Sequence, residues 1–241
     1  MEIIQLIGTS REEVDRVMEV IEWALEELGV PSNDIMVYVT DDHNKVREAL
    51  GMSTVTHEEW PIKCINVGID EPVVISVIPS KLLQLEESRM RVILLREVAL
   101  IKVMRDPVLS STWSIPQSID DQVVHRVSLA LLKRTIDLVI AQSQSLIQHL
   151  INAFNGDEIM RLLSACQPTV DCAITVLALD VPLSIEASGN VGLGRSLWNN
   201  LTRGGLDNDF TRRYEDFRDF VRNNFNVENT YNYLLMMFRR S

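Results

Sequence analysis

The chain has 241 residues, of which 46 % are hydrophobic and 24 % are charged, and these proportions are typical of a soluble globular protein. No apolar run reaches the roughly 20 residues needed to span a bilayer, and residues 2–8 carry Glu2 without a basic flank, so neither a membrane helix nor a signal peptide is expected. The net charge is −11, with 20 acidic and 11 basic residues within 1–107. An acidic surface repels phosphate groups, so the composition argues against nucleic-acid and membrane partners.

The first half of the chain alternates short apolar runs with helical patterns. Ser10 and Glu13 form a capping box that opens a helix to about Leu28. Strands are predicted at 2–7, 35–40, 62–67 and 73–78, the last two as a hairpin, with a short helix at 42–50 and a long helix at 81–105 that Pro107 ends.

The second half shows helical periodicity and no strong strand. Helices are predicted at 120–154, 157–166, 168–179, 206–223 and 228–240, and residues 181–205, rich in glycine, are predicted to be irregular. The sequence therefore predicts an α+β fold. A region at 1–107 with a small sheet is followed by a linker at about 108–117 and an all-helical region at 118–241 that packs on it.

Three cysteines, Cys64, Cys166 and Cys172, have no C-x-x-C spacing. An odd and sparse set favours free thiols in a reducing cytosol over a disulfide framework. Cys166 and Cys172 are flanked by apolar residues and are predicted to be core thiols, so a cytoplasmic location without disulfides is expected.

Residues 94–102 read Leu-Leu-Arg-Glu-Val-Ala-Leu-Ile-Lys. This stretch is similar to the zincin pattern L-L-H-E-[IV]-A-H-I-K, in which two histidines on one helix face bind zinc and the glutamate acts as general base. The order of elements over 1–107, a backing helix, a small sheet and then the active-site helix, also resembles a zincin of the minigluzincin type. The resemblance implies that fold for the first region.

The pattern departs from the family at Arg96 and Leu100, the two former ligand positions. Arginine is cationic with no lone pair to offer, and leucine has no donor atom, while zinc hydrolysis needs three protein ligands. No metal, cofactor or catalytic residue is therefore expected, and Glu97 is interpreted as the relic of the general base. A metallopeptidase with rewired ligands is the less favoured interpretation of the same stretch.

Glu97 has four apolar helical neighbours, one turn away on either side: Ile93, Leu94, Leu100 and Ile101. A carboxylate in such surroundings must be paired, hydrogen-bonded or protonated. It is thus either a structural ion-pair or capping partner or a base with no metal to serve.

The resemblance implies that a third zinc ligand would come from the next long helix, where His125 and Asp137 are the candidates. Lys133 and Arg134 precede Asp137 by one turn, so an intrahelical ion pair is the simpler interpretation. The sharper hypothesis is that Arg96 replaced the charge of the metal and pairs with Asp137.

A glycine-rich segment, Gly189–Ser196, reads G-x-x-x-x-G-R-S, with Gly189, Gly194, Arg195 and Ser196 at the positions that define a phosphate-binding loop. Arg195 stands where such a loop has its lysine, and Leu183–Ala187 is a poor candidate for the preceding strand. A simple connection between helices is the alternative.

Aromatic residues recur at helical spacing near the C-terminus, and they predict a core or a homodimer face: Phe210, Tyr214, Phe217, Phe220, Tyr231 and Phe238. Together these observations favour a non-catalytic zincin-like protein that binds an unidentified protein or peptide along an edge strand, or that serves as an assembly subunit. The alternative function is a nucleotide-binding enzyme or regulator that uses Gly189–Ser196.

Overall fold

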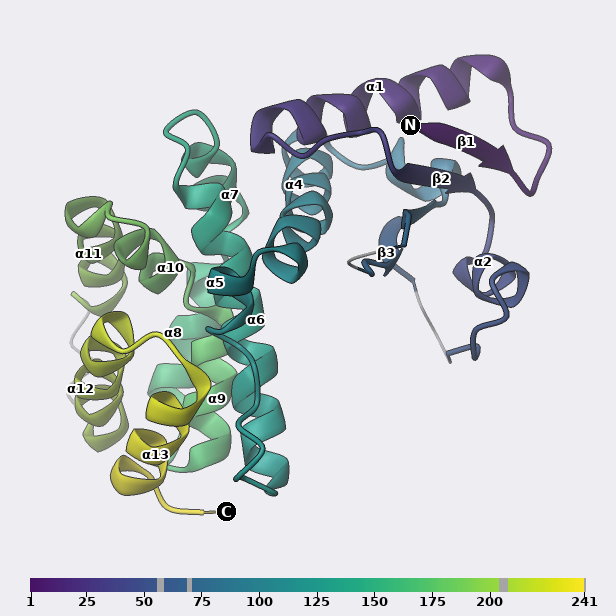
Figure 1. Cartoon of the computed structure of the whole chain (residues 1–241). Coiled ribbons are helices and arrows are strands. Elements are labelled where there is room, and N and C mark those ends of the chain that lie inside the picture. Colours follow the sequence, from purple (N-terminus) through teal and green to yellow (C-terminus); the bar gives the residue numbers. More distant parts are fainter. Residues whose placement is uncertain (56–58, 69–70, 204–207, 241) are drawn as a thin grey trace. The chain divides into compact units, whose positions relative to one another are not determined.

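The computed structural model describes residues 1–55, 59–68, 71–203 and 208–240 (Figure 1). The fold is α+β, as the sequence predicts. The chain forms two compact units, Met1–Arg105 and Asp106–Ser241, and the strands within the described ranges all belong to the first. None of the helices in these ranges has both the length and the apolar character that crossing a bilayer requires.

The described residues of the first unit form four strands and four helices. In chain order they are β1 (Glu2–Gln5), α1 (Arg11–Leu28), β2 (Ile35–Val39), α2 (His43–Ala49), β3 (Ile62–Asn66), β4 (Val73–Val77), α3 (Pro79–Leu82) and α4 (Glu87–Arg105). The predicted capping box is present, because the Ser10 side chain accepts from the backbone of Glu13 and the Glu13 side chain accepts from the backbone of Ser10.

The strands form one sheet in the order β1-β2-β4-β3. β1, β2 and β4 are parallel, whereas β3 pairs antiparallel with β4 and completes the predicted hairpin. The register of β3 against β4 shifts between Cys64 and Asn66, which marks a bulge at the end of β3. β1 and β3 are therefore the two edge strands of the described sheet.

The two faces of the sheet are buried to different degrees. One face carries the odd-numbered residues of β2 and β4. Among them, Val37, Ile75 and Val77 are fully buried. The helices α1 and α4 pack against each other, and α4 also packs against β3. The opposite face forms a smaller cluster of Tyr38 and Val74 with Val46 of α2.

The predicted long helix at 81–105 is wrong at its start, because the chain turns between α3 and α4. Leu83 and Leu85 lie in this turn and line a surface pocket beside Trp23 of α1. Residues two positions apart on a continuous helix would not share a face. The turn allows both leucines to lie on the same side. Residues 83–86 contain no glycine or proline from which the turn could be predicted.

The second unit is built of helices in its described part. They are α5 (Pro107–Ser110), α6 (Gln122–Ala141), α7 (Ile147–Ala153), α8 (Gly156–Ala165), α9 (Val170–Leu179), α10 (Val181–Ala187), α11 (Val191–Thr202), α12 (Asp209–Asn223) and α13 (Val227–Met237). The predicted start of the helix at 206 lies outside the described residues, and Asn208 caps α12.

The single helix predicted at 120–154 is wrong, because α6 and α7 are separated by a turn at 142–146. In this turn the Ser143 backbone donates to Ile140, and the Ser143 and Ser145 hydroxyls bond each other at 2.8 Å. Serine side chains compete with the helical backbone for hydrogen bonds, which accounts for the interruption.

The prediction that 181–205 is irregular is also wrong, since α10 and α11 occupy most of it. Asp180 caps α10 by accepting from Leu183, and Pro182 stands in the first turn, where a missing N–H costs nothing. The glycines at 189–205 favour an irregular segment, whereas Asp180 and Pro182 are the residue types that begin a helix.

The segment predicted as a linker belongs to the second unit. Trp113 and Ile115 pack against its hydrophobic core, and the Thr112 and Thr135 hydroxyls lie 2.7 Å apart. Most aromatic residues of α12 and α13 lie in the same core, and Tyr214 and Phe217 are completely buried. Phe220 is only partly buried and stacks on Tyr233, with the ring centroids 3.9 Å apart. The prediction of a core is confirmed for the buried residues, and the homodimer face stays a prediction.

Cys166 and Cys172 form a disulfide, with their Cα atoms 6.0 Å apart, so the prediction of free core thiols at these positions is wrong. The bond joins the end of α8 to α9 across Pro168. Cys64 is a buried free thiol, as expected. A disulfide removes the argument from cysteine usage for a reducing cytosol.

Candidate functional site

The stretch that is similar to the zincin pattern lies in the middle of α4. Its residues Leu94, Leu95, Val98 and Ala99 are buried, because α4 packs against both α1 and β3. Arg96, Glu97 and Leu100 are only partly buried. These three side chains thus share the side of α4 that retains access to solvent.

Glu97 is hydrogen-bonded, as its apolar neighbours require. Its Oε2 accepts from the backbone N–H of Cys64 on β3 at 2.7 Å. A hydrogen bond to an ionised acceptor is about twice as strong as a neutral one. The sequence predicts that Glu97 needs a partner, but the partner is a backbone group 33 residues earlier in the chain, which no local pattern identifies.

The Cys64 side chain lies close to this contact but is not a nucleophile. Burial, followed by the negative charge of Glu97, raises the pKa of the Cys64 thiol to about 12. The reactive form of cysteine is the thiolate, and a thiol with such a pKa remains protonated near neutral pH. Cys64 therefore contributes its backbone and its apolar volume to the site.

The backbone of β3 presents hydrogen-bonding groups to the outer edge of the sheet. Ile78 donates to the carbonyl of Pro61 at 2.8 Å, which makes this opposed pair a hydrogen-bonded one. Bonded and non-bonded pairs alternate in an antiparallel ladder. The N–H and C=O groups of Ile62 and Cys64 therefore point away from β4, and Glu97 takes the Cys64 donor.

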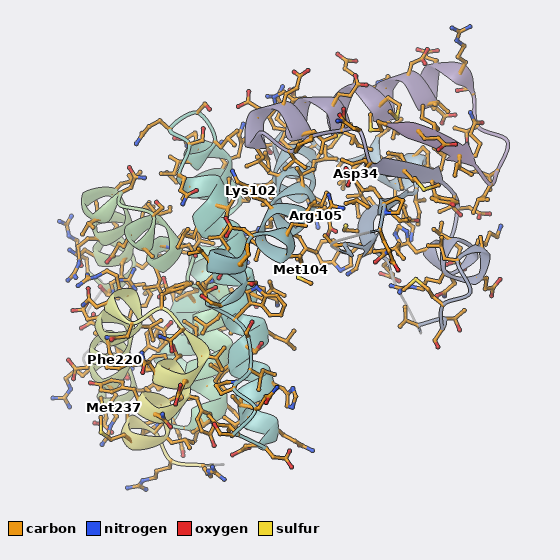
Figure 2. All side chains as sticks on the ribbon, in the orientation of Figure 1. Asp34, Lys102, Met104, Arg105, Phe220 and Met237 are labelled. Carbon is orange, nitrogen blue, oxygen red and sulfur yellow. A yellow bond between two sulfur atoms is a disulfide. The ribbon has the colours of Figure 1, made fainter. Side chains whose placement is uncertain are left out.

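Arg105, the last residue of α4, fixes the hairpin that carries this edge. Its Nη1 pairs with Asp34 at 2.7 Å, and its Nη2 donates to the carbonyls of Gly68 and Glu71 at 3.2 and 3.0 Å. Figure 2 labels Arg105 and Asp34. One guanidinium thus joins the start of β2 to both sides of the β3–β4 connection. The sequence assigned Arg105 no role beyond the end of a helix.

His43 fixes the beginning of β3. Its Nε2 lies 2.7 Å from the Trp60 carbonyl and its Nδ1 lies 2.7 Å from the Ser76 hydroxyl. A carbonyl only accepts, so Nε2 carries a proton and donates to the Trp60 carbonyl. His43 is completely buried, whereas Trp60 is half-exposed beside the edge strand.

Asp137 lies on α6 in the second unit and pairs with Arg134 at 2.9 Å. Both side chains are almost fully buried, so this is the intrahelical pair that the spacing indicates. Arg96 belongs to the first unit, and its pairing with Asp137 stays a hypothesis. The other ligand candidate, His125, lies exposed on α6. Among the described residues, no three His, Cys, Asp or Glu side chains are grouped so that they could hold a metal ion.

The glycine-rich segment begins in the turn between α10 and α11 and continues into α11. Residues 183–187, where a phosphate-binding loop would have its strand, belong to α10, and Gly194, Arg195 and Ser196 lie within α11. Gly189 adopts a φ of 102°, a conformation that favours glycine, and forms the turn. A Cβ atom on Gly194 would lie 2.5 Å from the carbonyl oxygen of Pro182, so this glycine permits close contact between α11 and α10.

Arg195 belongs to a network of charges that extends into the core of the second unit. It pairs with Asp219 at 2.9 Å, and Glu186 binds Arg218 at 2.8 Å and Arg222 at 2.9 Å. Glu186 and Arg218 are each only 2 % exposed. The arginine that would bind a phosphate is thus engaged with a carboxylate.

Asp180 is the most deeply buried acid of this network. It accepts from Arg218 at 2.9 Å and from the Tyr214 hydroxyl at 3.2 Å. Burial opposes the charge on Arg218, but Asp180 and Glu186 outweigh that effect, and the pKa of Arg218 is raised. Burial, followed by the charge of Asp180, raises the pKa of Tyr214 well above its usual range, which keeps the hydroxyl protonated as a donor.

A nucleotide titration tests the glycine-rich segment directly. Because Arg195 is paired and the segment is helical, millimolar ATP or GTP with magnesium is expected to leave the melting temperature of the protein unchanged within about 1 °C. A ligand at 100 times its Kd would stabilise the folded state by about 2.7 kcal/mol, a shift of several degrees. Such a shift, abolished by Arg195→Ala, would contradict the expectation.

The surroundings of Glu97 at the β3 edge are therefore the candidate site, and comparison with known proteins adds no further constraint. No protein-family model, no curated protein and no solved structure matches this chain.

Proposed function

We propose that the chain is a non-catalytic protein of zincin-like build that binds an extended segment of another protein along the outer edge of β3. The zincin-like part would be the first unit, and the helical second unit would follow it. As a subunit of an assembly, the chain would bind its neighbouring subunit through the same edge. The binding mode is strand addition, in which main-chain hydrogen bonds hold the segment and side-chain pockets select it.

The altered motif supports the absence of catalysis. Arg96 and Leu100 stand where the family has its two histidines, and neither side chain offers a lone pair to zinc. The order of elements supports the likeness, because α1 follows the first strand and α4 follows the last one after the short helix α3. Glu97 has a structural partner, which a general base serving a metal would not require.

One observation carries the binding proposal: the register of β3 directs the N–H and C=O groups of Ile62 and Cys64 away from the sheet. An edge strand with such groups is a template for another strand. The half-exposed Trp60 lies directly before β3, and tryptophan is enriched among the residues that dominate binding energy.

A peptide titration tests the proposal. The probe copies Val73–Val77, the strand that already pairs with β3, and carries two lysines at each end to complement the acidic first half of the chain. In heteronuclear NMR spectra we expect the amide signals of Ile62 and Cys64 to shift on titration, while those of β1 stay in place. The control peptide has proline in place of the central isoleucine, which removes a main-chain donor.

Two results would contradict this proposal. Shifts confined to β1, or equal shifts with the proline peptide, would show that β3 does not bind by strand addition. Stoichiometric zinc in elemental analysis of the purified protein would contradict the non-catalytic part, because it would require ligands other than those of the family pattern.

A further inference from the structure

The backbone N–H of Cys64 is one of the groups that an added strand would use, and it already has an acceptor. Glu97 Oε2 lies 2.7 Å from this nitrogen, at the outer edge of β3 and on the opposite side of the strand from β4. We infer that Glu97 is an internal competitor for the β3 edge, so that an incoming segment binds only by displacing its carboxylate from Cys64. This inference rests on the proposed function.

The position of the carboxylate is equivalent to that of a carbonyl oxygen on a neighbouring strand. Neighbouring strands are about 4.8 Å apart and are joined by N–H···O bonds of about 2.9 Å. A carboxylate oxygen at 2.7 Å satisfies the Cys64 donor as a strand would. A peptide carbonyl and Glu97 therefore cannot both bind this N–H in good geometry.

Competition of this kind has a protective role in a sheet. Exposed edges pair with other chains, and proteins limit this by placing charges at the edge. Glu97 is rooted in α4, whose neighbouring residues are packed against α1 and β3, so its position relative to Cys64 is well determined. Glu97 thus occupies the Cys64 N–H, one donor of the β3 edge, while the N–H and C=O groups of Ile62 remain directed outward.

The strength of the competitor should follow its charge. The carboxylate of Glu97 gives a charge-assisted bond, glutamine gives a neutral acceptor of the same length, and alanine gives none. Loss of one such bond changes an equilibrium by about tenfold. Affinity for the lysine-flanked copy of Val73–Val77 should therefore rise about threefold in Glu97→Gln and about tenfold in Glu97→Ala.

The matched control is Glu87→Ala. Glu87 lies on the same helix, but its side chain is 70 % exposed and pairs with Arg91 one turn away, remote from the β3 edge. This variant removes the same charge from α4, and its affinity for the peptide should equal that of the unaltered protein. Tighter binding by Glu87→Ala would attribute the effect to net charge and would overturn the inference.

Hydrogen exchange of the Cys64 amide, measured without peptide, tests the competitor separately from the proposed function. Exchange should accelerate about tenfold in Glu97→Ala and less in Glu97→Gln, which also serves if the alanine variant does not fold. Unchanged exchange, or equal peptide affinity in all variants, would overturn the inference and leave the proposed function standing. Faster exchange with no peptide binding by any variant would contradict the proposed function and leave the competitor standing. Dimerisation of Glu97→Ala through β3 would also support the competitor, since it would show a released edge.

Discussion

Asp180→Asn is expected to lower the free energy of unfolding of the second unit by about 3 kcal/mol, because breaking a buried ion pair leaves a charge without compensation. Asp180 is fully buried and accepts from Arg218 and Tyr214 as well as from the backbone of Leu183. Asparagine preserves the shape and the helix cap but not the charge. Of its two buried carboxylate partners, Arg218 would retain Glu186.

The matched control for this change is Asp219→Asn. Asp219 pairs with Arg195 and Arg222 in the same network, but its side chain is 49 % exposed. Exposed ion pairs contribute about 0–1 kcal/mol, so the loss should stay below 1 kcal/mol. Urea unfolding followed by circular dichroism measures both variants, and equal losses would contradict the central role assigned to Asp180.

Gly194→Ala and Gly192→Ala are expected to have opposite effects, although both residues lie in α11 and two positions apart. A Cβ atom on Gly194 would lie 2.5 Å from the Pro182 oxygen and 2.6 Å from Glu186 Cγ, whereas one on Gly192 would have nothing within 4 Å. Overpacking costs about 1–3 kcal/mol, while alanine gains about 0.5 kcal/mol over glycine near a helix start.

Thermal unfolding of the two glycine variants provides the measurement. Gly194→Ala should lower the melting temperature by about 2–12 °C, and Gly192→Ala should raise it by about 1–2 °C, using about 2–4 °C per kcal/mol. Stabilisation by both changes would show that α10 and α11 are not in the contact described here.

The parts of this fold that the sequence predicts are those with local chemical signals. The capping box of Ser10 and Glu13, the apolar strands and the hairpin of β3 and β4 have residue types that determine them over a few positions. Asp180 followed by Pro182 is an equally good signal for a helix start, but the glycines that follow predict an irregular segment. Gly194 lies within a helix, and glycine is needed there because the neighbouring helix leaves no room for a side chain. This is a tertiary requirement.

The candidate site shows the same limit. The apolar neighbours of Glu97 predict that its carboxylate needs a partner, and the hydrogen bond from Cys64 confirms it. The identity of that partner depends on the register of β3 against β4, which joins residues far apart in the sequence. The disulfide between Cys166 and Cys172 cannot be predicted from the cysteine spacing for a related reason, since its geometry depends on how α8 and α9 meet.

The guanidinium of Arg105 has a mechanical consequence. It belongs to the last residue of the first unit, and it binds Asp34 before β2 and the carbonyls on both sides of the β3–β4 connection. Tension applied to the chain at Asp106 would therefore reach the hairpin through the Arg105 side chain as well as through the packing of α4 against β3. Of these two routes, Arg105 is the one that acts on the β3–β4 connection.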